Sequence, residues 1–150
     1  MPIRRAMHHA ALLCGLMVIG PACAQFTFVP APLPAERRMS DAHTDFEYRK
    51  DAARHIYAAL PMRIFKGRLP PLLYGIAITE IDIDAEGNVV DVRLVREPVA
   101  AEVGPWIGAL IRRVAPFPPA PKVGPLTVTE IWLVHRSGNF QLDSLTEGQD

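Results

Sequence analysis

Apolar and polar residues alternate along two neighbouring stretches of the chain, residues 74–84 and residues 89–95. A period of two places every second side chain on the same face, which is the pattern of a β-strand. Between the two stretches, residues 85–88 are Ala-Glu-Gly-Asn, and Gly87 is suited to the positive φ that a tight turn requires. The pattern therefore predicts a β-hairpin.

The same alternation returns over residues 126–135, which we expect to form a third strand. Apolar residues at helical spacing appear instead over residues 41–60 and 104–115. Ser40 or Asp41 can cap the first of these helices, and prolines end both. The predicted buried faces are Phe46, Ala53, Ile56, Tyr57 and Leu60 in the first helix, and Ile107, Leu110, Ile111 and Val114 in the second.

These elements follow one another as helix, strand, strand, helix, strand. We expect an α+β fold with a small three-stranded antiparallel or mixed sheet (ββαβ), one helix packed on it and a preceding N-terminal helix. Residues 137–139 have the composition of a turn, and residues 141–150 are predicted to be a loose tail.

The N-terminal segment has the features of a cleavable secretory signal. Arg4 and Arg5 supply positive charge, residues 10–20 are apolar, and Ala22-Cys23-Ala24 is a small-x-small cleavage site. Both cysteines of the chain lie in this segment, so cleavage leaves a mature chain without thiols. Two alternatives stay open: an uncleaved membrane anchor, and a lipoprotein acylated on Cys23.

A proline-rich stretch follows the signal. Pro30, Pro32 and Pro34 alternate with small apolar residues, which favours an extended spacer. The expected organisation is a signal peptide (1–24), a Pro-rich extended leader (25–40), an N-terminal helix (41–60), a sheet-containing domain (61–140) and a loose tail (141–150).

Charge and composition narrow the classes of function. The chain has 16 basic and 16 acidic residues, and cleavage would remove two arginines, leaving a net charge of about −2. Without a basic excess we expect no nucleic-acid partner. We expect membrane contact only through a lipid on Cys23 or an uncleaved N-terminus. Because no catalytic or phosphate-binding motif is present, we expect no enzyme activity, no cofactor and no small-molecule substrate.

The order of these elements, and the turn and proline segments between them, resemble the C-terminal domain of TonB-type energy transducers. Leu60-Pro61 stands where that family usually has Tyr-Pro. The other matching segments are Ile81 to Val89 with its acidic turn, Val92 to Glu97, Leu110 to Ala115 with the following Phe/Pro-rich run to Pro121, and Val128 to Val134. The resemblance covers about residues 60 to 136 and, because the leader is short, is to a short stand-alone form.

The resemblance implies a periplasmic, non-enzymatic binding module. Members of that family dock an outer-membrane transporter by pairing its extended peptide segment, the TonB box, with an exposed sheet edge. The resemblance places that edge on the last predicted strand. The implied partner-binding residues are Thr127, Val128, Thr129, Glu130, Ile131, Trp132, Leu133, Val134 and His135.

Other interpretations remain open. The same edge would allow a self-associating structural or envelope-assembly domain. Asp82 and Asp84 share one face of a strand and would be the carboxylate pair of a hydrolase. The segment 82–87 partly imitates a calcium loop, but its closing acid is replaced by Arg93. The basic segment 62–68 is a second candidate contact surface, since Ile64 and Phe65 lie among cations.

Overall fold

The central strand of the protein is β1 (Gly75–Ile83), which pairs antiparallel with β2 (Val89–Arg96) on one side and β3 (Leu126–Val134) on the other. The structure is a computed structural model that describes residues 38–146 and 148. A short strand, β4 (Phe140–Leu142), adds to β3 and completes a four-stranded antiparallel sheet of order β2-β1-β3-β4. The fold is therefore α+β, as the sequence predicts.

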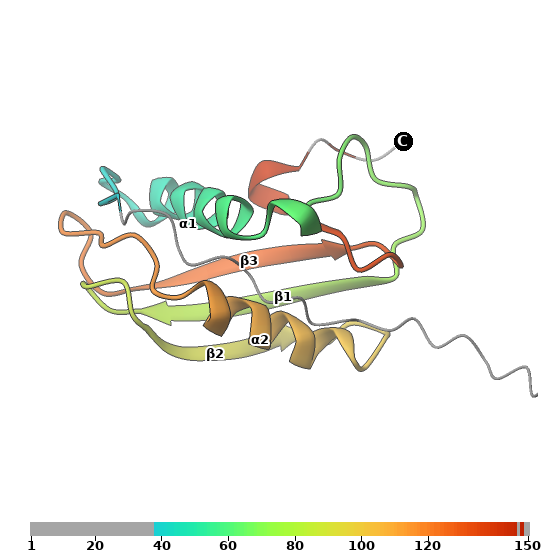
Figure 1. Cartoon of the computed structure of the whole chain (residues 1–150). Coiled ribbons are helices and arrows are strands. Elements are labelled where there is room, and N and C mark those ends of the chain that lie inside the picture. The colour runs from blue at the N-terminus through green and yellow to red at the C-terminus, as the bar shows by residue number, and fades with distance from the viewer. Residues whose placement is uncertain (1–37, 147, 149–150) are drawn as a thin grey trace, which may run out of the picture.

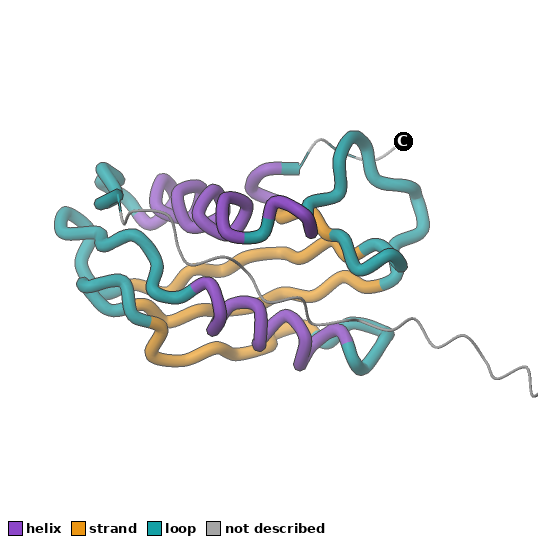
Figure 2. The backbone as a smooth tube through the Cα atoms, in the orientation of Figure 1, coloured by secondary structure: helices purple, strands orange, loops and turns teal. Residues whose placement is uncertain are grey.

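Two helices, α1 (Asp45–Ala59) and α2 (Val103–Val114), cover one face of this sheet (Figure 1). α1 packs beside β3, whereas α2 lies over β1 and β2. Short 3₁₀ turns, η1 (Pro61–Arg63) and η2 (Asp143–Leu145), follow α1 and β4. Figure 2 shows that loops join the elements at both ends of the sheet, and that no helix of the described residues covers its second face.

The predicted hairpin is present as β1 and β2. Gly87 has φ 89°, and its N–H donates to Asp84 O at 3.0 Å, so glycine is needed for the turn. Asp84 also holds the turn through its side chain, which accepts the N–H groups of Glu86 and Asn88 at 3.0 and 2.7 Å. The acidic turn is therefore held by hydrogen bonds among residues 84–88.

The core forms where alternate residues of β1 and β3 point toward the helices. Every residue of β1 pairs with one of β3, and the side chains of Ala77 and Trp132 lie opposite each other with no exposed surface. The Trp132 ring lies 4.8 Å from the Phe140 ring, which also meets Tyr57 edge-on. Burial of each such side chain contributes about 1.5–3 kcal/mol, so this aromatic group is a main source of stability.

The fourth strand corrects the prediction of a three-stranded sheet. Phe140, Gln141 and Leu142 are all buried, and their backbone pairs with Val134, Leu133 and Trp132. The prediction of a loose tail is therefore wrong for residues 141–145, which form the end of β4 and η2. A strand of three residues is too short to display a period of two, and its identity depends on contacts with β3.

The first helix begins later than predicted. Thr44 is its N-cap and accepts the N–H of Glu47 at 3.2 Å, instead of Ser40 or Asp41. Phe46, predicted on the buried face, is 67% exposed, whereas Tyr48 is fully buried. The predicted core residues of α2, in contrast, are all buried: Ile107, Leu110, Ile111 and Val114.

The predicted signal peptide and most of the predicted leader lie outside the described residues. Within residues 38–146 and 148, neither helix has the length and apolar character needed to cross a bilayer.

Candidate functional site: the outer edge of β3

The strand predicted to bind a partner is not the last strand of the sheet. β4 lies outside β3 but pairs only with Trp132, Leu133 and Val134. Along the rest of β3, residues 126–131, no strand of the described chain lies on the side away from β1. The sheet therefore has a partly open edge here, because β4 covers only about one third of β3.

The nine predicted partner-binding residues fall into three groups. Residues 127–131 belong to the open stretch, residues 132–134 are paired with β4, and His135 begins the β3–β4 turn, where its N–H donates to Asn139 O at 2.8 Å. Val128, Glu130, Trp132 and Val134 point into the core, whereas Thr127 and Thr129 are exposed on the helix-free face. Their binding of a partner stays a prediction, and only the first group has unpaired backbone.

The direction of the free backbone groups follows from two hydrogen bonds. The N–H groups of His135 and Ile131 both donate on the side away from β1, to Asn139 O and to Glu130 Oε1. Because backbone groups alternate between the two sides of an antiparallel strand, the N–H groups of Thr129 and Thr127 also point outward. These two residues are the ones that can pair with an added strand.

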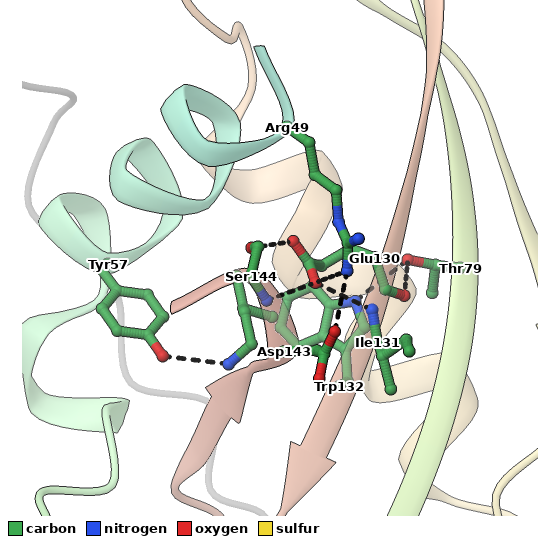
Figure 3. Close-up of polar contacts among 9 residues, drawn as sticks. Arg49, Tyr57, Thr79, Glu130, Ile131, Trp132, Asp143 and Ser144 are labelled. Atoms are coloured by element: carbon green, nitrogen blue, oxygen red, sulfur yellow. Dashed lines mark hydrogen bonds and ion pairs between the residues drawn. The ribbon is translucent and has the colours of Figure 1, made fainter. Parts of the chain in front are cut away.

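A buried carboxylate marks the limit of the open stretch (Figure 3). Glu130 is 1% exposed, and its Oε1 accepts the N–H of Ile131 at 3.0 Å and the N–H of Ser144 at 3.4 Å. The Ser144 hydroxyl donates to the other oxygen, Oε2. Glu130 therefore satisfies the outward N–H of Ile131, next to the part of β3 that pairs with β4, and fastens η2 beside it.

Arg49 of α1 compensates the charge of this carboxylate. Its Nη2 lies 3.0 Å from Glu130 Oε1 and 3.4 Å from Asp143 Oδ2. Burial alone would lower the pKa of Arg49, but hydrogen bonds and charge attraction from Glu130 and Asp143 outweigh it and raise that pKa. The group joins α1, β3 and η2, and its role in this geometry is to hold the C-terminal segment in place.

A second buried hydrogen bond fixes the neighbouring strands. Trp132 Nε1 donates to Thr79 Oγ1 at 3.0 Å, and both side chains are almost completely buried. Because the indole N–H must be satisfied in the core, this bond sets the register of Trp132 against β1. It also anchors β3 immediately beside the open stretch.

The carboxylates considered for hydrolysis, Asp82 and Asp84, both make contacts within the β1–β2 hairpin. Arg93 pairs with Asp82 and, at 3.1 and 3.2 Å, with Glu80 and Asp91. The Arg93 and Thr127 hydrogen bonds lower the pKa of Asp82, and the side-chain and backbone N–H groups of Asn88 lower the pKa of Asp84. Both carboxylates therefore make hydrogen bonds that stabilise the β1–β2 hairpin.

The other candidate groups are also engaged in structural contacts. The rings of Phe65 and His135 lie 4.9 Å apart, and a backbone bond of 2.9 Å joins Phe65 N–H to Phe140 O, so part of the basic segment 62–68 lies along β4. His55 Nε2 is 2.7 Å from Val114 O. Among the described residues, no group of three or more His, Cys, Asp or Glu side chains is placed to hold a metal ion.

Two features of the site were missed by the sequence reasoning. The first is the Arg49–Glu130–Ser144 group, which joins residues far apart in the chain. In the sequence, only the position of Glu130 indicates this group, because a charged residue there falls on the buried face of an alternating strand. The second is that β2, rather than β3, is an edge strand over its whole length in the described chain.

No family model matches this chain, and no curated protein or solved structure matches it either.

Proposed function

We propose that this protein is a non-enzymatic binding module of the TonB C-terminal type, exported to the periplasm, which docks an extended peptide segment of an outer-membrane transporter. The observation that supports it is the stretch of β3 from Leu126 to Ile131, which has no strand neighbour on its outer side in the described chain. Strand addition at such an edge needs only backbone groups, so ordinary side chains suffice.

The geometry of the edge limits the length of the peptide. The open stretch spans six residues, or roughly 20 Å at 3.4 Å per residue. At one end, η2 and the Glu130 carboxylate block further pairing. We therefore expect a short segment of about six residues to be recognised, with its backbone bonded to Thr127 and Thr129.

The test uses immobilised TonB-box peptides and the purified mature chain. We expect the unmodified peptide to retain the protein, and a peptide N-methylated at alternate residues to lose retention because it cannot donate hydrogen bonds to the edge. Thr129→Pro removes one outward N–H of β3 and should weaken retention about tenfold. Thr129→Val keeps that N–H and is the matched control; equal retention of the two variants would refute the assignment of this edge.

A second candidate is self-association as a structural or envelope-assembly domain. The observation that favours it is the outer side of β2, which also lacks a strand neighbour in the part of the chain that the structure describes. Edges of two copies would pair to form a continuous sheet. Light scattering over a range of protein concentrations separates the two candidates, because a strict monomer excludes this one.

Export is tested by the mass of the mature protein. A chain that starts at Gln25 supports cleavage after Ala24. Retention of Met1 would instead support an N-terminal anchor, and a lipid mass on Cys23 would support a lipoprotein.

A further inference from the structure

A hollow seam lies between α2 and the edge strand β2. Gly104, Gly108 and Arg112 follow one another at four-residue spacing and so share one stripe of α2. The two glycines contribute no side chain to the seam, whose opposite wall is formed by Val92 and Leu94 of β2. The space that remains is a hollow of about 300 Å³, open to solvent.

The hollow continues on the other side of Arg112. A second hollow, of about 320 Å³, is lined by Val89 and Val90 of β2 and by Ala115 and Pro116 at the end of α2. The Arg112 side chain lines both hollows. The seam therefore consists of two partly apolar hollows separated by one cation.

An open backbone edge runs beside these hollows. β2 pairs only with β1 among the described strands, and its register is regular from Asp91 to Leu94, between two irregularities. Val90 and Val95 are 71% and 57% exposed. Large apolar side chains that remain exposed on an edge strand favour pairing with another strand. An added strand would place alternate side chains toward the seam and hydrogen-bond to β2 at the same time.

The charges of the seam define the side chains that it would accept. Arg112 donates to Gly108 O at 3.3 Å, and in the described chain it has no carboxylate partner. Asp91 and Glu97 lie at the two hollows and disfavour further acids there. An acidic residue is therefore favoured opposite Arg112, and uncharged apolar residues are favoured on either side of it.

We propose that this seam is a docking site for an extended peptide segment of another protein, with an acidic side chain facing Arg112 and small apolar side chains two residues before and after it. Successive side chains on one face of a strand are about 6.8 Å apart, which suits two hollows on either side of one cation. This site is separate from the β3 edge, because β1 and β3 lie between them. The domain then presents strand-docking edges on two sides of one sheet.

The probe is a labelled nine-residue peptide, Val-Ser-Val-Ser-Glu-Ser-Val-Ser-Val, in which the central acid and the apolar residues share one face. Binding to the full mature chain is measured by fluorescence anisotropy. We expect saturable binding that falls about tenfold when the central Glu of the peptide is replaced by Lys, since it then faces Arg112.

Two protein variants with matched controls locate the site. Arg112→Glu should weaken binding about tenfold, whereas Lys50→Glu, the same charge change on α1, should not. Gly108→Leu fills the seam, and an added Cβ there meets only the mobile end of Arg112, at 3.2 Å, so the variant is expected to fold. Ala109→Leu adds the same side chain at an exposed position of α2 and should bind normally.

Several outcomes would overturn this proposal. Absence of binding, or binding that neither Arg112→Glu nor Gly108→Leu reduces, would exclude the seam. Loss of binding in Thr129→Pro alone would assign the peptide to the β3 edge instead, so failure here and failure of the proposed function are distinguishable. A dimer that forms without peptide and that Gly108→Leu abolishes would identify a second copy as the occupant.

Discussion

Arg49 Nη2 of α1 lies 3.0 Å from Glu130 Oε1 of β3, and this ion pair helps to hold the C-terminal segment beside the β3 edge. The carboxylate also holds Ser144, so η2 is fixed against the strand at the point where β4 ends. The C-terminal segment is also attached by the three strand pairs of β4 and by hydrogen bonds from Leu142 N–H to the Tyr57 hydroxyl and from Gln141 Nε2 to Phe65 O. The length of the open edge thus depends on contacts between three distant segments.

The first prediction concerns this ion pair. Glu130→Ala removes the acceptor of Ile131 N–H and Ser144 N–H and leaves the charge of Arg49 partly buried. Breaking a buried pair typically costs 3–5 kcal/mol; because Arg49 is 27% exposed, we expect a loss of about 2–3 kcal/mol in the free energy of unfolding. Urea unfolding followed by circular dichroism measures it.

The control for this variant is Glu80→Ala. Glu80 is also paired with an arginine, Arg93, at 3.1 Å, but its side chain is 35% exposed. A solvent-exposed pair contributes about 0–1 kcal/mol, so the control should lose less than Glu130→Ala. Equal losses would mean that the Arg49–Glu130 pair has no special role in stability.

The second prediction concerns the β1–β2 turn. Gly87 has φ 89°, and a Cβ added to it would lie 2.1 Å from the backbone oxygen of Phe117. We expect Gly87→Ala to destabilise the fold by more than about 2 kcal/mol, from the strained φ and the displaced Phe117 together. Gly124→Ala is the matched control, since Gly124 has φ 83° but no atom within 4 Å of its added Cβ. Its cost should be about 1 kcal/mol, and a difference of zero between the variants would contradict the close contact.

The third prediction concerns the buried indole. Thr79→Val keeps the shape of the side chain but removes the acceptor of Trp132 Nε1–H, now 3.0 Å away. An unsatisfied buried donor costs about 1–3 kcal/mol, and we expect a loss of that size in thermal or urea unfolding. Thr129→Val, on the exposed face of β3, should change stability by less than about 0.5 kcal/mol. A Thr79→Val variant as stable as the control would show that Trp132 finds another acceptor.

The fourth prediction is a pH dependence. Hydrogen bonds from the side chain and backbone N–H of Asn88 lower the pKa of Asp84 in the folded protein. A carboxyl with a lowered folded pKa stabilises the fold above its unfolded pKa of about 3.9, and this contribution is lost as the pH falls through the folded value. The stability difference between the native chain and Asp84→Asn should therefore be constant from about pH 7 to 5 and shrink below about pH 4. A difference that grows on acidification would contradict this sign.

Local sequence patterns predict most of the helices and strands. The strands β1, β2 and β3 and the helix α2 lie within a few residues of their predicted ranges, because each buries one face with a clear period. Phe46 was assigned to the core for its spacing alone, and it is exposed because α1 packs through Tyr48, Ala52 and Ala53 instead. Spacing identifies a helix, but the partner that covers it decides which face is buried.

The candidate site was less predictable than the fold. The prediction places its nine residues on one unpaired edge of the sheet. Three of them pair with β4, a strand that no local sequence pattern predicts. The seam beside β2 depends on two glycines in α2 and on the way that helix lies over the strand, which the sequence does not reveal.

By itself, the sequence determined the α+β class, the hairpin and the helix that follows it, because alternation, helical spacing, glycine and proline act over a few residues. Only the tertiary structure decided which edges stay open, since that depends on where the C-terminal segment packs. Phe140 and Leu142 are buried against distant residues, and the Arg49–Glu130 pair joins positions 81 residues apart. The partners in such contacts cannot be identified from a local pattern, because their free energy is gained only when the chain brings the segments together.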